Sequence, residues 1–113
     1  MARINYIELP SAALTASKTF YAEAFEMKLV DYGPTYSCTV SGDVDVGLQG
    51  DSGGATTAPL PVILVDDLEA TLAAVVKAGG IIVCPIFTFP GGRRFHFRDP
   101  SGNELAAWVQ SEA

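Results

Sequence analysis

Residues 60–85, LPVILVDDLEATLAAVVKAGGIIVCP, contain the pattern that decides the fold. The apolar run over residues 60–65 predicts a buried strand, and Asp66-Asp67 supplies a cap for the start of a helix. Gly79-Gly80 ends this helix, because glycine readily adopts the left-handed backbone of a helix end. Between these signals the apolar side chains recur every three or four residues, as on one face of an amphipathic helix: Leu68, Leu72, Val75 and Val76.

Three more strands are predicted after this helix. Residues 81–85, 93–98 and 104–109 have the short apolar or alternating composition that is typical of strands. Turn-forming residues separate them, at 89–92 (Phe-Pro-Gly-Gly) and at 99–103 (Asp-Pro-Ser-Gly-Asn). The second half of the chain is therefore predicted to run strand, helix, strand, strand, strand.

The first half of the chain repeats this order. Strands are predicted over residues 3–9, 28–32, 36–41 and 44–49. The helix after the first strand carries one apolar stripe, formed by Leu14, Ser17, Phe20, Tyr21, Ala24 and Phe25. We predict a single domain over residues 1–113, in which a flexible linker of small residues at 51–59 joins a first module at 1–50 to a second at 60–113.

Two such modules predict an α+β fold, in which two βαβββ units form a cup-shaped mixed sheet with the helices on the outside. A helix covers only one face of its four strands, so the other face lines a concave surface suited to a ligand. Because side chains alternate along a strand, Ile7 and Leu9 should pack under the first helix while Tyr6 and Glu8 face the cup. In the last strand the same alternation turns Glu104, Ala106 and Trp108 toward the cup, and Leu105, Ala107 and Val109 toward the helix.

The strand at residues 93–98 has two faces of different chemistry. Arg94, His96 and Arg98 share one face, and Arg93, Phe95 and Phe97 share the other. The sequence leaves open which of the two faces the cup.

The composition limits the classes of function. The chain has 113 residues, 49% of them hydrophobic, which predicts one folded domain with a core. Its net charge of -6 and its pI near 4.5 argue against nucleic-acid binding, because phosphates are neutralised by a basic face. Neither a membrane-spanning run nor the apolar stretch of a signal peptide is present. We therefore expect a cytoplasmic protein with no nucleic-acid and no membrane partner.

Three stretches, in this order, resemble the glyoxalase/bleomycin-resistance/extradiol-dioxygenase superfamily, also called the vicinal oxygen chelate superfamily. Residues 4–25 look like its opening strand and the helix that ends in Phe-Tyr. Residues 65–68, Val-Asp-Asp-Leu, look like the start of its second module, and residues 97–103 look like its closing hairpin, usually Asp-Pro-x-Gly-Asn. The resemblance covers nearly the whole chain and implies a homodimer, which the small size and the open sheet edges also favour.

The resemblance also implies a metal site that this sequence does not match. Enzymes of the superfamily hold a divalent metal through His, Glu or Gln on the first and last strands of each module. The positions that correspond to these ligands are Tyr6, Gly47, Leu60 and Ala106. Tyrosine is a rare metal ligand, and glycine, leucine and alanine have no ligating side chain. We therefore expect neither the usual metal site nor any cofactor; a divalent metal held by Glu8, His96 and Glu104 is the alternative.

The candidate catalytic residue is Glu8, because a carboxylate on an inward face is costly to bury without a partner and can act as a general base. A structural ion pair with Arg94 or Arg98 is the competing interpretation. His96, the only histidine, either titrates near neutral pH within a site or packs as an ordinary strand residue. The full set of candidate ligand-binding residues is Tyr6, Glu8, Arg94, His96, Glu104 and Trp108.

Three functions remain open from the sequence. The first is a small-molecule-binding protein that takes an aromatic or amphipathic ligand in the cup, as bleomycin-resistance members do without chemistry. The second is a metal-dependent lyase or dioxygenase with non-standard ligands, and the third is a dimeric accessory or regulatory module. We favour the first, because the usual metal ligands are missing; whether the chain is an enzyme stays open.

Overall fold

The computed structural model describes residues 2–111, and its elements follow the order strand, helix, strand, strand, strand twice. This confirms the predicted α+β fold of two βαβββ sets. The backbone divides into two compact units. We call Tyr6–Leu60 the N-terminal unit, and the described residues of Met1–Asn5 and Pro61–Ala113 the C-terminal unit. Because β1 begins in one unit and ends in the other, each unit is described by itself.

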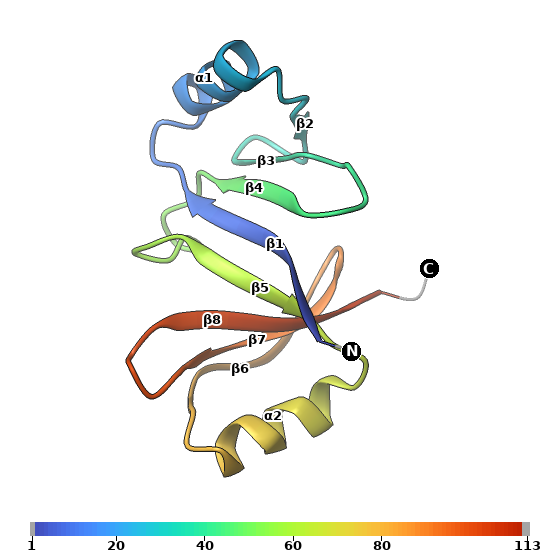
Figure 1. The fold of residues 1–113 in the computed structure, drawn as a ribbon. Helices are drawn as coiled ribbons and strands as arrows, with labels where there is room; N and C mark the ends of the chain where they lie inside the picture. Colours follow the sequence, from blue (N-terminus) through green and yellow to red (C-terminus); the bar gives the residue numbers. More distant parts are fainter. Residues whose placement is uncertain (1, 112–113) are drawn as a thin grey trace. The chain divides into compact units, whose positions relative to one another are not determined.

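The N-terminal unit has one helix and a small mixed set of strands (Figure 1). The strands are ordered β2-β3-β4-β1, with β1 parallel to β4 and the other neighbours antiparallel. β2 and β3 end earlier than the sequence predicted, and the chain turns between Cys38 and Asp45. The elements are β1 (Arg3–Pro10), α1 (Leu14–Phe25), β2 (Val30–Asp31), β3 (Tyr36–Cys38) and β4 (Asp45–Gln49).

The C-terminal unit repeats this arrangement (Figure 1), and its β6, β7 and β8 are longer than β2, β3 and β4. Its strands are ordered β5-β8-β7-β6, with β5 parallel to β8 and the other neighbours antiparallel. The elements are β5 (Leu60–Leu64), α2 (Leu68–Lys77), β6 (Ile81–Phe89), β7 (Gly92–Arg98) and β8 (Glu104–Gln110).

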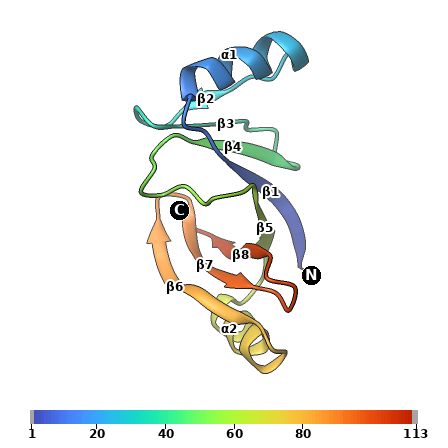
Figure 2. The same cartoon turned by 90° about the vertical axis from the view of Figure 1, so that its left-hand side faces the viewer.

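The core of the C-terminal unit forms where α2 packs on its strands (Figure 2). Leu68 of α2, Phe95 of β7 and Ala107 of β8 are fully buried together. Asp67 caps the helix as predicted, since its side chain accepts the Ala70 N–H at 3.0 Å. The position of Phe95 also resolves the question about β7: its phenylalanine face packs on α2, so Arg94, His96 and Arg98 lie on the opposite face. The half-buried residues around this core are Val65, Leu72, Val75, Ile82, Ile86, Phe97 and Val109.

β6 is longer than the sequence predicted. It continues through Pro85 to Phe89, whereas we expected it to end at residue 85. Register shifts on both sides of Cys84 interrupt its pairing with β7, and such bulges are where a strand tolerates a proline, which has no N–H to donate. The extension places Phe87 directly opposite Arg94.

The helix α1 is less buried than its apolar stripe suggested. None of its residues is fully buried; Phe20 is 56% exposed and Phe25 is 62% exposed. Phe20 makes an edge-to-face contact with Tyr21, with ring centroids 5.1 Å apart, so the aromatic side chains pack partly on one another. An ion pair of 2.6 Å between Lys18 Nζ and Asp31 Oδ1 joins the helix to β2.

Within residues 2–111, no helix is long and apolar enough to cross a lipid bilayer.

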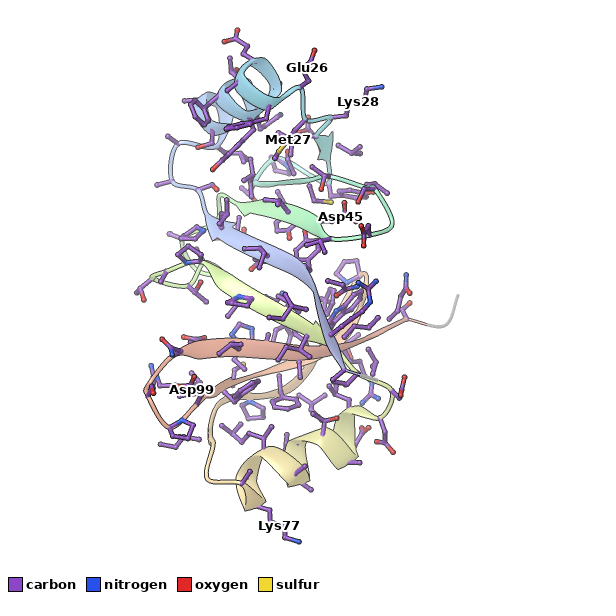
Figure 3. The ribbon with its side chains drawn as sticks, in the orientation of Figure 1. Glu26, Met27, Lys28, Asp45, Lys77 and Asp99 are labelled. Atoms are coloured by element: carbon purple, nitrogen blue, oxygen red, sulfur yellow. The ribbon has the colours of Figure 1, made fainter. Side chains whose placement is uncertain are left out.

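The hairpin between β7 and β8 is organised by one carboxylate, Asp99 (Figure 3). Its Oδ1 accepts the N–H groups of Ser101 and Asn103, each at 2.9 Å, and its Oδ2 accepts the Asn103 side-chain amide at 3.1 Å. The Asn103 side chain, followed by these backbone N–H groups, holds the pKa of Asp99 below its usual range. The φ of Gly102 is 87°, a backbone conformation that residues with a side chain rarely adopt.

Replacing Phe95 by alanine tests the core of the C-terminal unit. We expect Phe95→Ala to lower the free energy of unfolding by about 3–5 kcal/mol, because it removes a fully buried ring from a packed cluster. Urea unfolding followed by circular dichroism measures the change. Val76→Ala on α2 is the control, since Val76 is 53% exposed and its loss should cost little. Equal costs for the two variants would contradict the assignment of the core.

The pH dependence of Asp99→Asn tests the hairpin. Because the folded-state pKa of Asp99 is lowered, its carboxylate stabilises the fold above the unfolded pKa of about 3.9, and this contribution is lost as the pH falls through the folded pKa. Asp99→Asn should therefore be less stable than the unchanged protein near neutral pH. The stability gap should shrink in acid below about pH 4, and a gap that stays constant into that range would show that the charge of Asp99 does not matter.

Candidate functional site

The N-terminal unit contains a chain of hydrogen bonds that joins β1 to β3. Tyr6 and Glu8 lie on one face of β1, and Glu8 lies opposite Gly47 of β4. The Tyr6 hydroxyl is 2.5 Å from the Tyr36 hydroxyl, and Tyr36 donates to Glu8 Oε2 at 2.9 Å. Since the proton of Tyr36 is used on Glu8, Tyr6 is the donor to the Tyr36 oxygen. The proton order therefore runs from Tyr6 through Tyr36 to the carboxylate.

Burial fixes the protonation of both tyrosines. Glu8 is only 4% exposed, so its carboxylate depends on hydrogen-bond donors within the protein. Desolvation raises the pKa of Tyr36 far above its usual value, and the nearby Glu8 carboxylate raises it further. Desolvation likewise raises the pKa of Tyr6. Both phenols are therefore neutral donors at physiological pH, and this is the state that the buried Glu8 requires.

Gly47 leaves the space in which the two hydroxyls meet. A Cβ at this position would lie 2.1 Å from the Tyr6 hydroxyl and 2.1 Å from the Tyr36 hydroxyl. A ligating side chain at position 47 is therefore excluded while both tyrosines are present. The other superfamily positions do not supply a ligand either, because Leu60 and Ala106 are apolar and fully buried.

The usual metal of the superfamily does not fit these residues. Of the four corresponding positions only Tyr6 has a polar side chain, and its hydroxyl is used in the hydrogen bond to Tyr36. The alternative set of Glu8, His96 and Glu104 draws its members from both units. In the part of the chain that the structure describes, no group of three or more His, Cys, Asp or Glu side chains is arranged to hold a metal ion.

The C-terminal unit has an aromatic face on the side of its strands opposite α2. We define this aromatic face as Phe87, Phe89, Arg94 and Trp108. The Arg94 guanidinium lies over two rings, 5.3 Å from the centroid of Phe87 and 5.4 Å from that of Phe89, which is the geometry of cation–π contacts. Phe89 and Trp108 have ring centroids 6.2 Å apart, and the Trp108 indole N–H donates to Asn5 Oδ1 at 2.9 Å. All four side chains are half-buried, so part of their planar surface is accessible.

His96 lies next to this face and is oriented by a carboxylate. Its Nδ1 is 2.8 Å from Glu104 Oε2, and its ring centroid is 5.8 Å from that of Phe87. A carboxylate only accepts hydrogen bonds, so Nδ1 carries a proton and the other ring nitrogen, Nε2, is left for a different partner. His96 is 7% exposed, and its Nε2 is a buried atom with no hydrogen-bond partner among residues 2–111.

The structure brings the six candidate residues together in small groups. In the N-terminal unit, Tyr6 and Glu8 are joined through Tyr36. In the C-terminal unit, His96 is paired with Glu104, and Arg94 lies opposite Trp108 on the next strand. Of the other basic residues near them, Arg98 is exposed, and Arg93 makes a two-pronged ion pair with Glu69 at 2.6 and 3.3 Å.

Sequence reasoning missed three roles in these groups. It did not single out Tyr36, which is the donor to Glu8. It treated Gly47 as a lost ligand position and not as the space for two hydroxyls, and it did not single out Asn5, the acceptor for Trp108. All three depend on strand register or long-range pairing. The one local signal was the need of a buried Glu8 for a donor.

A double-mutant cycle tests the packing at Gly47. Gly47→Ala should destabilise the N-terminal unit by about 3 kcal/mol, because its Cβ overlaps both hydroxyls. In the background of Tyr6→Phe and Tyr36→Phe the same substitution should cost at least about 1 kcal/mol less. Urea unfolding gives each value. Gly53→Ala is the control, since its Cβ would only touch Asp51 Oδ1 at 3.4 Å. Strict additivity in the cycle would show that the hydroxyls do not occupy this space.

Comparisons with known proteins agree with this fold along nearly the whole chain. The protein named "Putative glyoxylase CFP32", from Mycobacterium tuberculosis and Mycobacterium bovis, is 29% identical over 115 residues, covering 92% of this chain and 44% of the relative. This chain therefore spans less than half the length of those curated relatives.

Two solved structures share the fold at low identity. The hypothetical protein BH1468 from Bacillus halodurans has a TM-score of 0.78 at 13% identity, with 99% of this chain and 96% of that chain covered. The Mn(II)-bound glyoxalase from Novosphingobium aromaticivorans has a TM-score of 0.65 at 18% identity, with 96% of this chain and 40% of that chain covered. A family model matches residues 3–107, and the chain therefore belongs to the Glyoxalase/Bleomycin resistance protein/Dioxygenase superfamily.

Proposed function

We propose that this superfamily member binds a small aromatic molecule on the aromatic face of its C-terminal unit, without the usual metal. The observation that carries the proposal is the grouping of Phe87, Phe89, Arg94 and Trp108 on the side of the strands that α2 does not cover. These side chains are half-buried, and the core residues of the unit lie on the other side.

The chemistry of the aromatic face favours a planar ligand. Aromatic rings attract further rings in offset or edge-to-face arrangements, each pair contributing about 0.5–1.5 kcal/mol beyond area burial. Arg94 adds a cation whose plane stacks on Phe87 and Phe89, and a guanidinium also attracts the electron-rich face or an anionic substituent of a ligand. Ligand sites in proteins have this composition, with apolar walls and a few placed polar groups.

The residues at the usual metal positions support binding over metal-dependent chemistry. Gly47 is enclosed by the hydroxyls of Tyr6 and Tyr36, and Leu60 and Ala106 are apolar. The names of the mycobacterial relative and of the Novosphingobium structure point to glyoxalase-type enzymes, but each of those chains is more than twice as long as the segment that this chain matches.

Tryptophan fluorescence tests the proposal directly, because Trp108 is the only tryptophan and lies within the aromatic face. We expect 3-nitroanisole, a neutral aromatic quencher, to quench this fluorescence in a saturable manner. Phe87→Ala or Phe89→Ala should weaken the binding about two- to tenfold, the equivalent of one ring contact.

Phe25→Ala is the matched control, since Phe25 is an exposed phenylalanine of α1 in the other unit. Circular dichroism should show that all variants stay folded. Quenching that rises linearly without saturation, or that weakens equally in Phe25→Ala and Phe87→Ala, would contradict binding on the aromatic face.

A further inference from the structure

His96 has a buried nitrogen that nothing in the described chain satisfies. The residue is 7% exposed, and Nε2 has no hydrogen-bond partner among residues 2–111. Leaving a buried polar atom unpaired costs about 1–3 kcal/mol, so such atoms in folded proteins call for a partner. The other ring nitrogen, Nδ1, is already hydrogen-bonded to Glu104 Oε2 at 2.8 Å. Nε2 is therefore the open position of an otherwise fixed ring.

Glu104 also determines what kind of partner Nε2 can take. The Glu104 carboxylate accepts the Nδ1–H, so in the neutral form of the imidazole Nε2 holds the lone pair and is a hydrogen-bond acceptor. The same pairing holds the ring in one orientation. A partner of the neutral ring at Nε2 is therefore a hydrogen-bond donor.

The surroundings of His96 favour a donor carried on an aromatic ring. The Phe87 ring, a member of the aromatic face, lies 5.8 Å from the imidazole. On the neighbouring strands, the residues opposite His96 are Ala106 and Cys84. An aromatic molecule that stacks on the neighbouring rings needs only one polar group to complete the contact.

We infer that His96 Nε2 is the polar anchor of the aromatic face, and that the ligand is a phenol whose O–H is donated to this nitrogen. This inference rests on the proposed function and names its ligand class. One proton lies between the phenol oxygen and Nε2, and Glu104 acts as the positioning residue that keeps the lone pair directed at the ligand. No covalent bond to the ligand is formed.

Access to the anchor requires a side chain to move. Nε2 is buried, so the ligand reaches it only when a neighbouring group is displaced. Phe87 is suited to this movement, because its ring contacts the imidazole and is itself only half-buried. Its displacement would open the nitrogen from the side of the aromatic face, where the ligand ring stacks.

Two probes that differ only at the oxygen test the inference. 3-Nitrophenol has an O–H where 3-nitroanisole has a methyl ether, and both can be followed by quenching of Trp108 near neutral pH. We expect the unchanged protein to bind the phenol about tenfold more tightly, as one buried hydrogen bond predicts. His96→Phe should abolish this preference while the anisole still binds. His96→Gln, whose amide oxygen can accept the O–H, should recover part of it.

The outcomes distinguish a failure of the role of His96 from a failure of ligand binding on the aromatic face. Equal affinity of the unchanged protein for both probes would overturn the role of His96 and leave the proposed function standing, and this comparison needs no variant. A preference for the phenol that survives in His96→Phe would also overturn it, because the O–H would then bind elsewhere. Binding of neither probe would refute the proposed function, and the inference with it.

Discussion

Burying the carboxylate of Glu8 is the constraint on which the arrangement of the N-terminal unit depends. A charge that is removed from water needs donors at hydrogen-bond distance. Tyr36 supplies one from β3, and Tyr6 completes the chain by donating to Tyr36. Two phenol rings can approach the carboxylate together only where the intervening strand has no side chain, and Gly47 provides that position. One requirement thus fixes four residues on three strands.

The C-terminal unit follows a different rule, the separation of its strands into an apolar and a mixed face. Phe95 and Ala107 lie against α2, and the alternation of side chains then directs Arg94, His96 and Trp108 to the other face. The side chains best suited to meet a ligand therefore lie where the helix is absent. The packing that stabilises the unit and the groups that we propose to contact a ligand therefore lie on opposite faces of the same strands.

Much of the fold follows from sequence pattern, and less of the candidate site does. The helical spacing around Leu68 and the cap at Asp67 predicted α2 correctly, because both signals are local. The end of β6 was predicted wrongly, since the bulges that carry the strand past Pro85 depend on its pairing with β7. The exposure of Phe20 depends on tertiary packing that the spacing of an apolar stripe does not contain.

The site residues show the same division between local and long-range information. Alternation was enough to group Tyr6 with Glu8, and Glu104 with Trp108. It could not reveal that Tyr36 reaches Glu8 or that Glu104 reaches His96, because those contacts depend on the register between strands. Residue type alone could not distinguish a histidine packed in a strand from one with a free buried nitrogen.

The enclosure of Gly47 has a consequence for how this sequence can change over evolutionary time. A metal ligand at position 47 cannot be introduced by a single substitution, since a new side chain there meets the two hydroxyls already in place. Tyr6, Tyr36 and Gly47 would have to change together, and Glu8 would lose the hydrogen bond from Tyr36 on the way. The present arrangement is thus separated from a metal-binding one by a mutational barrier, which favours its persistence once formed.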